Sequence, residues 1–310
     1  MKRQYRVRNW SEYNAGLKHR GSLTFWVSHE ALEHWLVCEK TGRRGASPTY
    51  SDIAIATITT LKKLFRLAGR QAQGFVQSLF ELMDIALPVP DHSTVSRRLG
   101  SLSVSMPVVP KRGARHVVVD ATGIKVYGEG EWKTRQHGVD KRRTWRKLHL
   151  GVDEATGEIL VAEVTTNDYR DSEVLGSLLD GISHEVSQVS GDGAYDTFGC
   201  HDTIAQRGAM VTIPPRHDAQ RCRPTEHRST HPRDQILQRI EQVGRKDWKR
   251  ESGYHRRSLS ETTMFRLKVI FGGQVCSRKF DNQAVELFLQ CAALNRMIQV
   301  AKPQSYPIDQ

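Results

Sequence analysis

The hydrophobic period of the chain changes at His116. Before this residue, apolar side chains recur at spacings of three and four, which predicts helices at about 51–67 and 71–86. From His116 onward, short β-branched runs alternate with turn residues and with further helical patterns. This order predicts a mixed α/β (α+β) fold, in which helices precede a domain built on a buried central sheet.

The second part of the chain contains β-branched or alternating runs bounded by Gly, Pro and Asp. The predicted strands are 116–120, 123–127, 147–152, 158–165, 186–190 and 210–213. The predicted helices are 171–182, 200–207, 233–243, 253–272 and 283–300. The proline- and glycine-containing residues 101–115 are expected to form a linker, and the tail from Pro303 is expected to be loose.

Basic residues outnumber acidic ones, with 46 Lys and Arg against 34 Asp and Glu and a formal charge of +12. This excess favours a polyanionic partner, nucleic acid before a membrane surface, although charge alone does not separate a nucleic-acid-binding protein from any other basic protein. Seven basic residues lie between Lys133 and Lys147, in a loop or ribbon close in sequence to Asp120. Within this cluster, Lys133, Arg142 and Arg143 are candidate DNA-binding residues.

Residues 75–100 are similar to a helix-turn-helix. A helix is followed by a tight turn with Pro88 and Pro90, and a short second helix starts after the capping residue Asp91. Arg97 and Arg98 end this second helix and are candidates for contacting DNA. An ordinary helical pair is the alternative interpretation.

The first 20 residues are basic and aromatic. They are expected to form either an arm on DNA phosphates or a strap on the core.

Two aspartates end apolar strands. Asp120 and Asp192 are each followed by glycine within three residues, and a carboxylate at the end of a buried strand points into the crevice where α/β proteins bind ligands. Together with a glutamate from a packed helix, they would form an oxygen-ligand site for Mg²⁺ or Mn²⁺, with two ions. Taken alone, each aspartate is more often a turn former or a cap.

The segment Gly253–Gly272, GYHRRSLSETTMFRLKVIFG, is predicted as one uninterrupted helix that carries an acidic ligand. At 100° per residue, Tyr254, Arg257, Glu261 and Lys268 fall within roughly 60° of one another on one face. This stripe combines a tyrosine, two cations and one carboxylate. The alternative is a solvated helix face on which Arg257 and Glu261 form an ordinary i,i+4 ion pair.

Two competing assignments concern neighbouring residues. Asp196 is an alternative to Asp192 as the second ligand, but it lies beyond the strand end and suits the N-cap of the next helix. A zinc site would need a compact tetrahedral ligand pattern, and the spacing of the available residues does not supply one. Those residues are His217, Cys222, His227 and His231. The sequence has no glycine-rich phosphate loop, so no nucleotide cofactor is expected.

The five cysteines are odd in number and contain no CxxC pair, which favours free thiols in a reducing cytoplasm. The first residues form no apolar leader, and no run approaches the ~18 apolar residues of a membrane span. A cytoplasmic, nucleoid-associated bacterial protein without a membrane partner is the expectation.

These motifs together resemble the DDE transposases of the bacterial insertion-sequence-five type. VVVDATG is followed by GDGAYD and then by the segment around Glu261. The wider group carries a signature of Tyr, two residues, Arg, three residues, Glu, six residues and Lys. Tyr254, Arg257, Glu261 and Lys268 match every spacing, and the similarity runs from about residue 20 to 300.

The resemblance implies an RNase H-like catalytic domain at 106–300, interrupted by a basic insertion at about 214–250, behind a helical DNA-binding domain at 1–105 and followed by a tail at 301–310. Asp120, Asp192 and Glu261 would be the catalytic metal ligands. Tyr254, Arg257 and Lys268 would contact the transposon end. The implied chemistry is metal-dependent cleavage at the element's end, which frees a 3′-hydroxyl for attack on target DNA.

A non-catalytic or domesticated DNA-binding repressor with the same fold is the alternative function. The double-stranded DNA partner would comprise transposon ends and target DNA, and cutting two ends together implies at least a homodimer in the DNA complex. No motif indicates the sequence of the terminal repeat or the target site. Nor does any motif indicate whether cleavage passes through a DNA hairpin.

Overall fold

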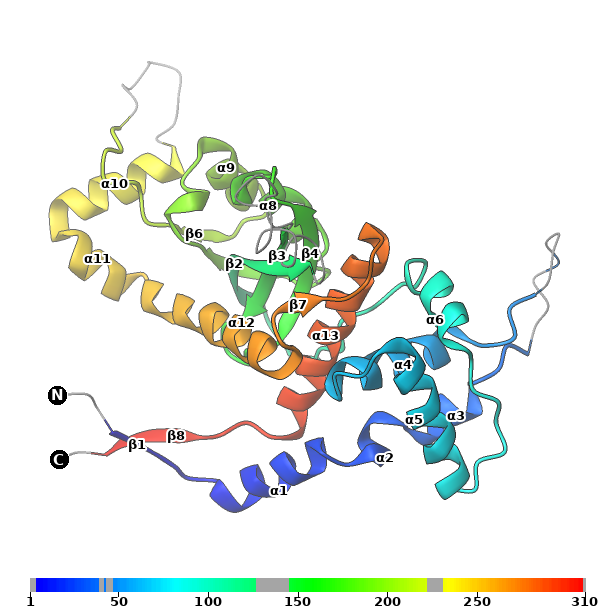
Figure 1. The fold of residues 1–310 in the computed structure, drawn as a ribbon. Helices are drawn as coiled ribbons and strands as arrows, with labels where there is room; N and C mark the ends of the chain where they lie inside the picture. The colour runs from blue at the N-terminus through cyan, green and yellow to red at the C-terminus, as the bar shows by residue number, and fades with distance from the viewer. Residues whose placement is uncertain (1–3, 39–41, 43–46, 127–144, 222–230, 309–310) are drawn as a thin grey trace, which may run out of the picture. The chain divides into compact units, whose positions relative to one another are not determined.

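The computed structural model describes residues 4–38, 42, 47–126, 145–221 and 231–308, and its chain forms two compact units (Figure 1). One unit combines Met1–Pro107 with Ser277–Gln310, and the other is the continuous stretch Val108–Cys276. None of the helices in the described ranges has both the length and the apolar character needed to cross a membrane.

The first unit is helical, as the sequence predicts. Its helices are α1 Trp10–Arg20, α2 Leu23–Trp26, α3 His29–Glu33, α4 Asp52–Leu64, α5 Gly69–Leu82, α6 His92–Leu99 and α13 Phe280–Val300. Side-chain caps fix several of their first turns: Ser28 accepts a hydrogen bond from the Ala31 N–H, and Asp91 accepts from the N–H groups of Ser93 and Thr94. The predicted cap at Asp91 is therefore confirmed.

The connection between α5 and α6 differs from the predicted tight turn. Residues 83–91 separate the two helices, which is longer than the three or four residues of a helix-turn-helix turn. The two prolines hold this connection extended, and the Pro88 carbonyl accepts a 2.8 Å hydrogen bond from the indole of the buried Trp35.

Helix α13 packs on α1, α4 and α6. A buried ion pair joins it to α4: Lys63 Nζ lies 2.6 Å from Glu286 Oε1, and the same carboxylate accepts bonds from the backbone and hydroxyl of Ser277. The predicted catalytic domain extends to residue 300, whereas residues 277–300 belong to the same compact unit as the N-terminal helices. The apolar face of a helix does not reveal which element it will cover.

The two ends of the chain form a ribbon. Strand β1, Gln4–Val7, pairs antiparallel with β8, Ser305–Ile308. The prediction that the tail is loose is therefore wrong for residues 305–308, because their partner is the other terminus and no local pattern reports such a pairing.

The second unit contains a six-stranded sheet. Its strands are β2 Arg115–Val126, β3 Trp145–Asp153, β4 Ile159–Thr166, β5 Val186–Ser190, β6 Met210–Thr212 and the short β7 Gln274–Val275. The main order is β4-β3-β2-β5-β6, with β7 beside the far end of β2. Strand β3 runs antiparallel to both β2 and β4, whereas β5 and β7 run parallel to β2, and β6 runs parallel to β5. This is the RNase H-like arrangement that the sequence predicts.

Strand β2 is one long strand rather than the two predicted runs. Its ladder with β3 continues without interruption from Val117 to Lys125, through the Asp-Ala-Thr-Gly stretch that suggested a turn. Gly123 is part of this ladder. A Cβ added here would lie only 3.3 Å from the Trp145 ring, so there is little room for a side chain. The cross-strand neighbour, not a bend, explains this glycine.

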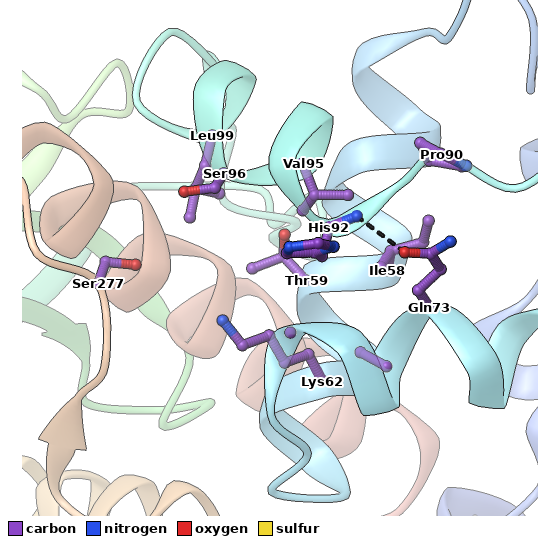
Figure 2. A pocket seen from close by; sticks show the side chains of 12 residues that line it. Ile58, Thr59, Lys62, Gln73, Pro90, His92, Val95, Ser96, Leu99 and Ser277 are labelled. Atoms are coloured by element: carbon purple, nitrogen blue, oxygen red, sulfur yellow. Dashed lines mark hydrogen bonds between the residues drawn. The ribbon is translucent and has the colours of Figure 1, made fainter.

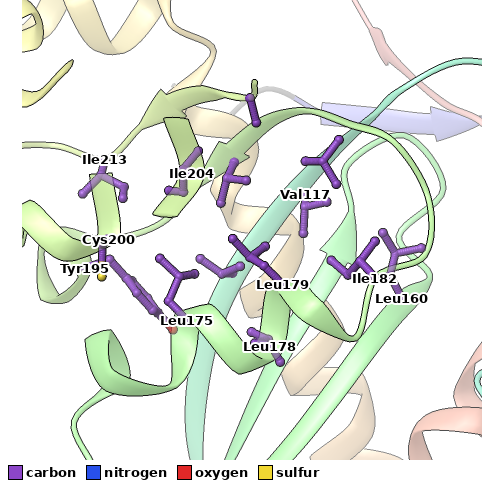
Figure 3. Packing of buried hydrophobic residues seen from close by; sticks show 14 residues of the cluster. Val117, Leu160, Leu175, Leu178, Leu179, Ile182, Tyr195, Cys200, Ile204 and Ile213 are labelled. Atoms are coloured by element: carbon purple, nitrogen blue, oxygen red, sulfur yellow. The ribbon is translucent and has the colours of Figure 1, made fainter. Parts of the chain in front are cut away.

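Helices cover both faces of the sheet. On one face, apolar side chains of β2 and β5 pack against α8, Asp171–Asp180, and α9, Phe198–Gln206; Figure 3 shows Val117 near Leu179 and Ile182 in this core. Side chains alternate across a strand, so Val117 and Val119 face α8 while Asp120 faces the other side. On that side lies α12, Ser258–Phe271, which contacts β2 and β3.

The inserted segment contains α10, Pro232–Val243, and α11, Arg245–Glu251. A 3₁₀ turn, Tyr254–Arg257, then leads into α12. The predicted uninterrupted helix is therefore wrong at its start, because Gly253 adopts φ +70° and the next four residues wind more tightly than an α-helix. Tyr254 and Arg257 precede α12, whereas Glu261 and Lys268 lie within it.

Candidate active site

The sheet register brings Asp120 and Asp192 to the same place. Val118 on β2 pairs with Ser190 on the parallel strand β5, and each aspartate lies two residues further along its strand direction. Asp192 then caps the short 3₁₀ turn Gly193–Tyr195, where its Oδ1 accepts from the Ala194 N–H at 2.8 Å. The register thus places Asp120 and Asp192 on neighbouring strands near the carboxyl end of β5. The prediction that Asp120 ends a strand is wrong, because β2 continues to Val126.

Helix α12 supplies the third carboxylate. Arg257 Nη1 lies 3.3 Å from Asp120 Oδ2, and its Nη2 donates to Glu261 Oε1. The Ser260 hydroxyl also donates to Asp120 Oδ2, at 3.1 Å. A single guanidinium therefore links a strand carboxylate and a helix carboxylate that are far apart in sequence. The i,i+4 pair of Arg257 and Glu261 does form, but it belongs to this larger cluster.

Burial sets the protonation behaviour of Asp120. Its side chain is 14% exposed, and burial raises the pKa of this carboxyl, with a further upward contribution from the nearby Asp192 charge. The Ala121 N–H, Arg257 and Ser260 act in the opposite direction. For Arg257, burial alone would lower the pKa, but Tyr254, Asp120, Glu261 and Asp192 together raise it. The charges of all three carboxylates therefore contribute to the pKa of Arg257.

Tyr254 lies beside Arg257, whereas Lys268 lies at the other end of α12. The Tyr254 ring is half-buried beside Trp248, with Lys249 Nζ 5.0 Å and the Arg257 guanidinium 5.9 Å from its centroid. Lys268 lies in the last turn of α12 and is partly exposed. Its stem runs beside Gly273, where an added Cβ would lie 3.4 Å from Lys268 Cγ.

Asp196 is neither an N-cap nor a neighbour of the cluster's guanidinium. Thr197 caps α9 instead, because its hydroxyl accepts from the Cys200 N–H. Asp196 is buried and held by Arg233, by the Arg216 N–H and by His201, which keeps the pKa of its carboxyl low despite burial. The prediction that Asp196 caps α9 is wrong, and its partners give it a structural role.

The other sequence-predicted residues fall in different places. Arg97 is exposed on α6, whereas Arg98 turns toward α4 and bonds with Asp52 and the Tyr50 carbonyl. Lys133, Arg142 and Arg143 lie outside the described residues, as do Cys222 and His227. His231 pairs with Asp202 at 2.9 Å and caps α10. Among the residues that the structure describes, no three His, Cys, Asp or Glu side chains gather closely enough to hold a metal ion.

The first unit contains a small hollow. It lies between α4, α5 and α6, lined by residues that include Lys62, Gln73 and His92 (Figure 2). Its volume of about 40 Å³ admits a few water molecules and is far below that of a ligand pocket. Val95, Ser96 and Leu99 on α6 line this hollow, while Ser93 and Arg97 of the same helix are exposed.

Sequence reasoning did not identify several residues that shape the site. Ser260 donates to Asp120 from one turn into α12, and Arg233 holds Asp196 from the inserted segment. On the α8 side of the sheet, the Tyr195 hydroxyl and His149 Nδ1 are buried without a hydrogen-bond partner among the described residues. Each depends on a contact between segments distant in sequence, so no local pattern marks it.

The fold and the site define an RNase H-like domain that carries Asp120 within its central strand β2 and Asp192 just after the neighbouring strand β5. A family model described as the transposase DDE domain matches residues 111–296, and a second model of the same description matches residues 18–129. The chain belongs to the DDE transposase family.

Among solved structures, the chain is similar to a piggyBac transposase synaptic complex with hairpin DNA, determined by cryo-EM. The identity is 12%, the match covers 95% of this chain and 77% of that one, and the TM-score is 0.36.

Proposed function

We propose that this transposase binds the terminal inverted repeats of an insertion sequence, cleaves the DNA at the element's ends by metal-dependent hydrolysis, and joins the freed 3′-hydroxyl to target DNA. The observation that supports this most directly is that one guanidinium links a carboxylate of β2 to a carboxylate of α12. Asp120 and Asp192 are adjacent through the β2–β5 register, and Glu261 shares the Arg257 guanidinium with Asp120.

The carboxylates are of the type that a divalent cation prefers, although the described part of the chain holds no three such side chains close enough to bind one. Two of the carboxylates already share a cationic group, and carboxylate oxygens are the ligands that Mg²⁺ and Mn²⁺ prefer. Asp120, Asp192 and Glu261 would hold the metal, as one or two ions. Bound there, the metal would lower the pKa of an attacking water and stabilise the leaving oxygen. Asp120 is kept in orientation by the Ala121 N–H at 2.9 Å and by the Ser260 hydroxyl.

Basic and aromatic groups around the carboxylates would position the DNA backbone. Tyr254, Arg257 and Lys268 surround Glu261 on α12 and its preceding turn, so we assign them to the transposon end. The exposed face of α6 with Arg97 would contribute to DNA binding by the helical unit. Lys133, Arg142 and Arg143 stay candidates for the same role.

Cleavage of a labelled duplex bearing the inverted repeats that flank the coding sequence tests the proposal. With Mg²⁺, wild-type protein should nick the 3′ ends and transfer them into a plasmid. Asp120→Asn, Asp192→Asn and Glu261→Gln should each reduce nicking by more than about 10³-fold. Asp180→Asn is the matched control, because this surface carboxylate pairs with Arg207 on α9's C-terminal side and not with the site.

The outcomes separate the alternatives. Tight DNA binding without nicking by wild type would support a non-catalytic repressor, and nicking without plasmid transfer would support a nuclease. Nicking that survives all three substitutions would reject the assigned ligands. We also infer the insertion-sequence-five subtype and a homodimer on DNA; light scattering of the complex with two repeat-bearing duplexes checks the second point.

A further inference from the structure

The terminal ribbon of β1 and β8 is exposed on both of its faces. It extends from the ends of α1 and α13 in the helical unit (Figure 1). Tyr5 is 60% exposed and Tyr306 is 39% exposed. Arg6, Arg8 and Pro307 are exposed as well. A two-stranded ribbon that buries so little gains little stability from packing, so a role as a strap on the core does not explain it.

One face of the ribbon combines positive charge with an aromatic ring. Arg6 lies directly opposite Tyr306 in the ladder, and Arg8 follows Arg6 on the same face because side chains alternate along a strand. The Arg8 guanidinium lies 5.8 Å from the centroid of the Tyr306 ring. In the sequence, positions 1–11 and 301–308 contain no Asp or Glu. The face formed by Arg6, Arg8 and Tyr306, here called the ribbon face, therefore has no acidic neighbour along either strand.

Hydrogen bonds fix the base of the ribbon. The Arg8 N–H donates to the Gln304 carbonyl at 2.8 Å, which extends the ladder by one residue pair. The Asn9 side chain then bridges the two ends of the chain, because its Nδ2 donates to the Lys302 carbonyl at 3.0 Å and its Oδ1 accepts from the Gln304 N–H at 2.8 Å. The ribbon is therefore ordered before it meets a partner, which reduces the entropy lost on binding.

The outer edge of β8 is poorly suited to pairing with another strand. Arg8 and Gln304 form a hydrogen-bonded pair, and such pairs alternate along an antiparallel ladder. Pro307 lies opposite Tyr5 at a position of the other kind, so its nitrogen points away from β1. Proline has no N–H, so this edge lacks a donor that a strand from a second copy would need. The charge of the ribbon face favours a polyanion instead.

We propose that the β1–β8 ribbon is a DNA-contacting element, whose ribbon face lies on the backbone of double-stranded DNA. Arg6 and Arg8 donate to phosphate oxygens, and the Tyr306 ring packs on the backbone between them. The shape also fits, because the major groove, about 12 Å wide, admits a two-stranded β-ribbon. This inference rests on the proposed function, since the partner is the same DNA, but it concerns the ends of the chain and not the carboxylates.

Gel-shift titration of the full-length protein at several salt concentrations tests the inference. The double variant Arg6→Gln Arg8→Gln should bind a repeat-bearing duplex roughly tenfold more weakly and lower the salt slope by about two, because each lost phosphate contact releases about one counterion fewer. The same loss should occur with an unrelated duplex of equal length, since phosphate contacts carry no sequence information. A loss confined to the repeat-bearing duplex would contradict binding through phosphates.

The double variant Arg207→Gln Arg239→Gln is the matched control. It removes the same charge from two exposed residues, but these pair with Asp180 and Glu251. This variant should keep the wild-type DNA affinity and salt slope. Equal salt slopes for the two double variants would overturn the inference, because the effect would then come from net charge alone.

Photo-cross-linking distinguishes DNA from a second copy of the chain. Tyr306→p-benzoylphenylalanine, irradiated with a labelled duplex, should give a covalent protein–DNA adduct. A covalent protein dimer without a DNA adduct would show that the ribbon joins two copies, which overturns the inference.

Failure of the inference and failure of the proposed function give different results. If wild type nicks DNA while Arg6→Gln Arg8→Gln binds as tightly as wild type, the ribbon is not a DNA contact and the proposed function stands. If wild type neither binds nor nicks a repeat-bearing duplex, both are rejected. Should the double variant not fold, the single variant Arg6→Gln decides, since an unchanged salt slope contradicts a phosphate contact.

Discussion

Arg233 donates two hydrogen bonds to Asp196, one of 2.7 Å from Nε and one of 3.0 Å from Nη2, and both side chains are almost fully buried. The backbone N–H of Arg216 reaches the same carboxylate at 2.8 Å. Asp196 therefore ties the beginning of the inserted segment and α10 to the end of β5. The two aspartates therefore have separate roles. Asp196 stabilises the fold through its buried ion pair, whereas Asp192 lies near Asp120.

Arg233→Gln should lower the free energy of unfolding by about 3 kcal/mol, because it leaves a buried carboxylate without its charged partner. Urea denaturation followed by circular dichroism measures this loss. Asp192→Asn should abolish cleavage and leave the unfolding midpoint nearly unchanged. If Asp192→Asn destabilises the protein as much as Arg233→Gln does, the division of roles between the two aspartates is wrong.

Arg97 and Arg98 are adjacent, but their substitution should affect different properties: DNA binding for Arg97 and stability for Arg98. Arg97→Gln should weaken DNA binding roughly fivefold and reduce the salt slope by about one, with no change in melting temperature. Arg98→Gln should cost about 1 kcal/mol of stability, because Arg98 bonds with Asp52 and the Tyr50 carbonyl. Gel-shift titration at several salt concentrations and thermal unfolding separate the two. An unchanged salt slope for Arg97→Gln would exclude this face of α6 from the DNA interface.

Protonation of His149 should destabilise the protein in mild acid. Burial lowers the pKa of His149 to about 4; Asp171 opposes this shift and Lys147 adds to it. Between the unfolded value of about 6.5 and pH 4, the unfolded chain binds the extra proton, so stability falls as pH falls, by at most about 3 kcal/mol. His149→Gln should flatten this dependence when unfolding is measured from pH 7 to 4.5. The exposed His255→Gln serves as control, and an equal slope in wild type and His149→Gln would contradict the assignment.

Gly191→Ala should impair cleavage more than stability. An added Cβ would lie 2.9 Å from the Tyr195 ring and 3.2 Å from Val119 Cγ2, so the backbone that carries Asp192 must shift. Displacement of a reacting group by about 1 Å can cost ~10²-fold in rate. Gly199→Ala is the control, because nothing lies within 4 Å of its added Cβ. Single-turnover nicking rates compare the two variants, and similar rates would show that the Gly191 backbone tolerates the methyl group.

The sequence was most informative where a local pattern carries the signal. The β-branched runs that precede Asp120 and Asp192 predict the two central strands, and Asp91 predicts the start of α6; the structure confirms these elements. The RNase H-like fold and the family follow from the motifs and are shown by the topology and the family models. The roles of the individual site residues stay predictions.

Long-range contacts account for what the sequence did not predict. Arg257 and Asp120 are 137 positions apart, so the spacing on α12 revealed the partner Glu261 but not the strand carboxylate. Asp196 looked like a cap because its neighbours are polar, and its partner Arg233 comes from the start of α10 within the insertion. Pairing of β1 with β8 likewise joins the two termini, for which periodicity carries no information.

The division of the chain has a consequence for its biosynthesis. The unit Val108–Cys276 is continuous, so it can fold as soon as it leaves the ribosome. The helical unit also begins early, but α4 and α6 lack α13, and β1 lacks β8, until residues 280–308 have been made. The first helices to be synthesised are therefore among the last to be completed, and a polypeptide released early would carry a finished sheet beside an unfinished set of helices.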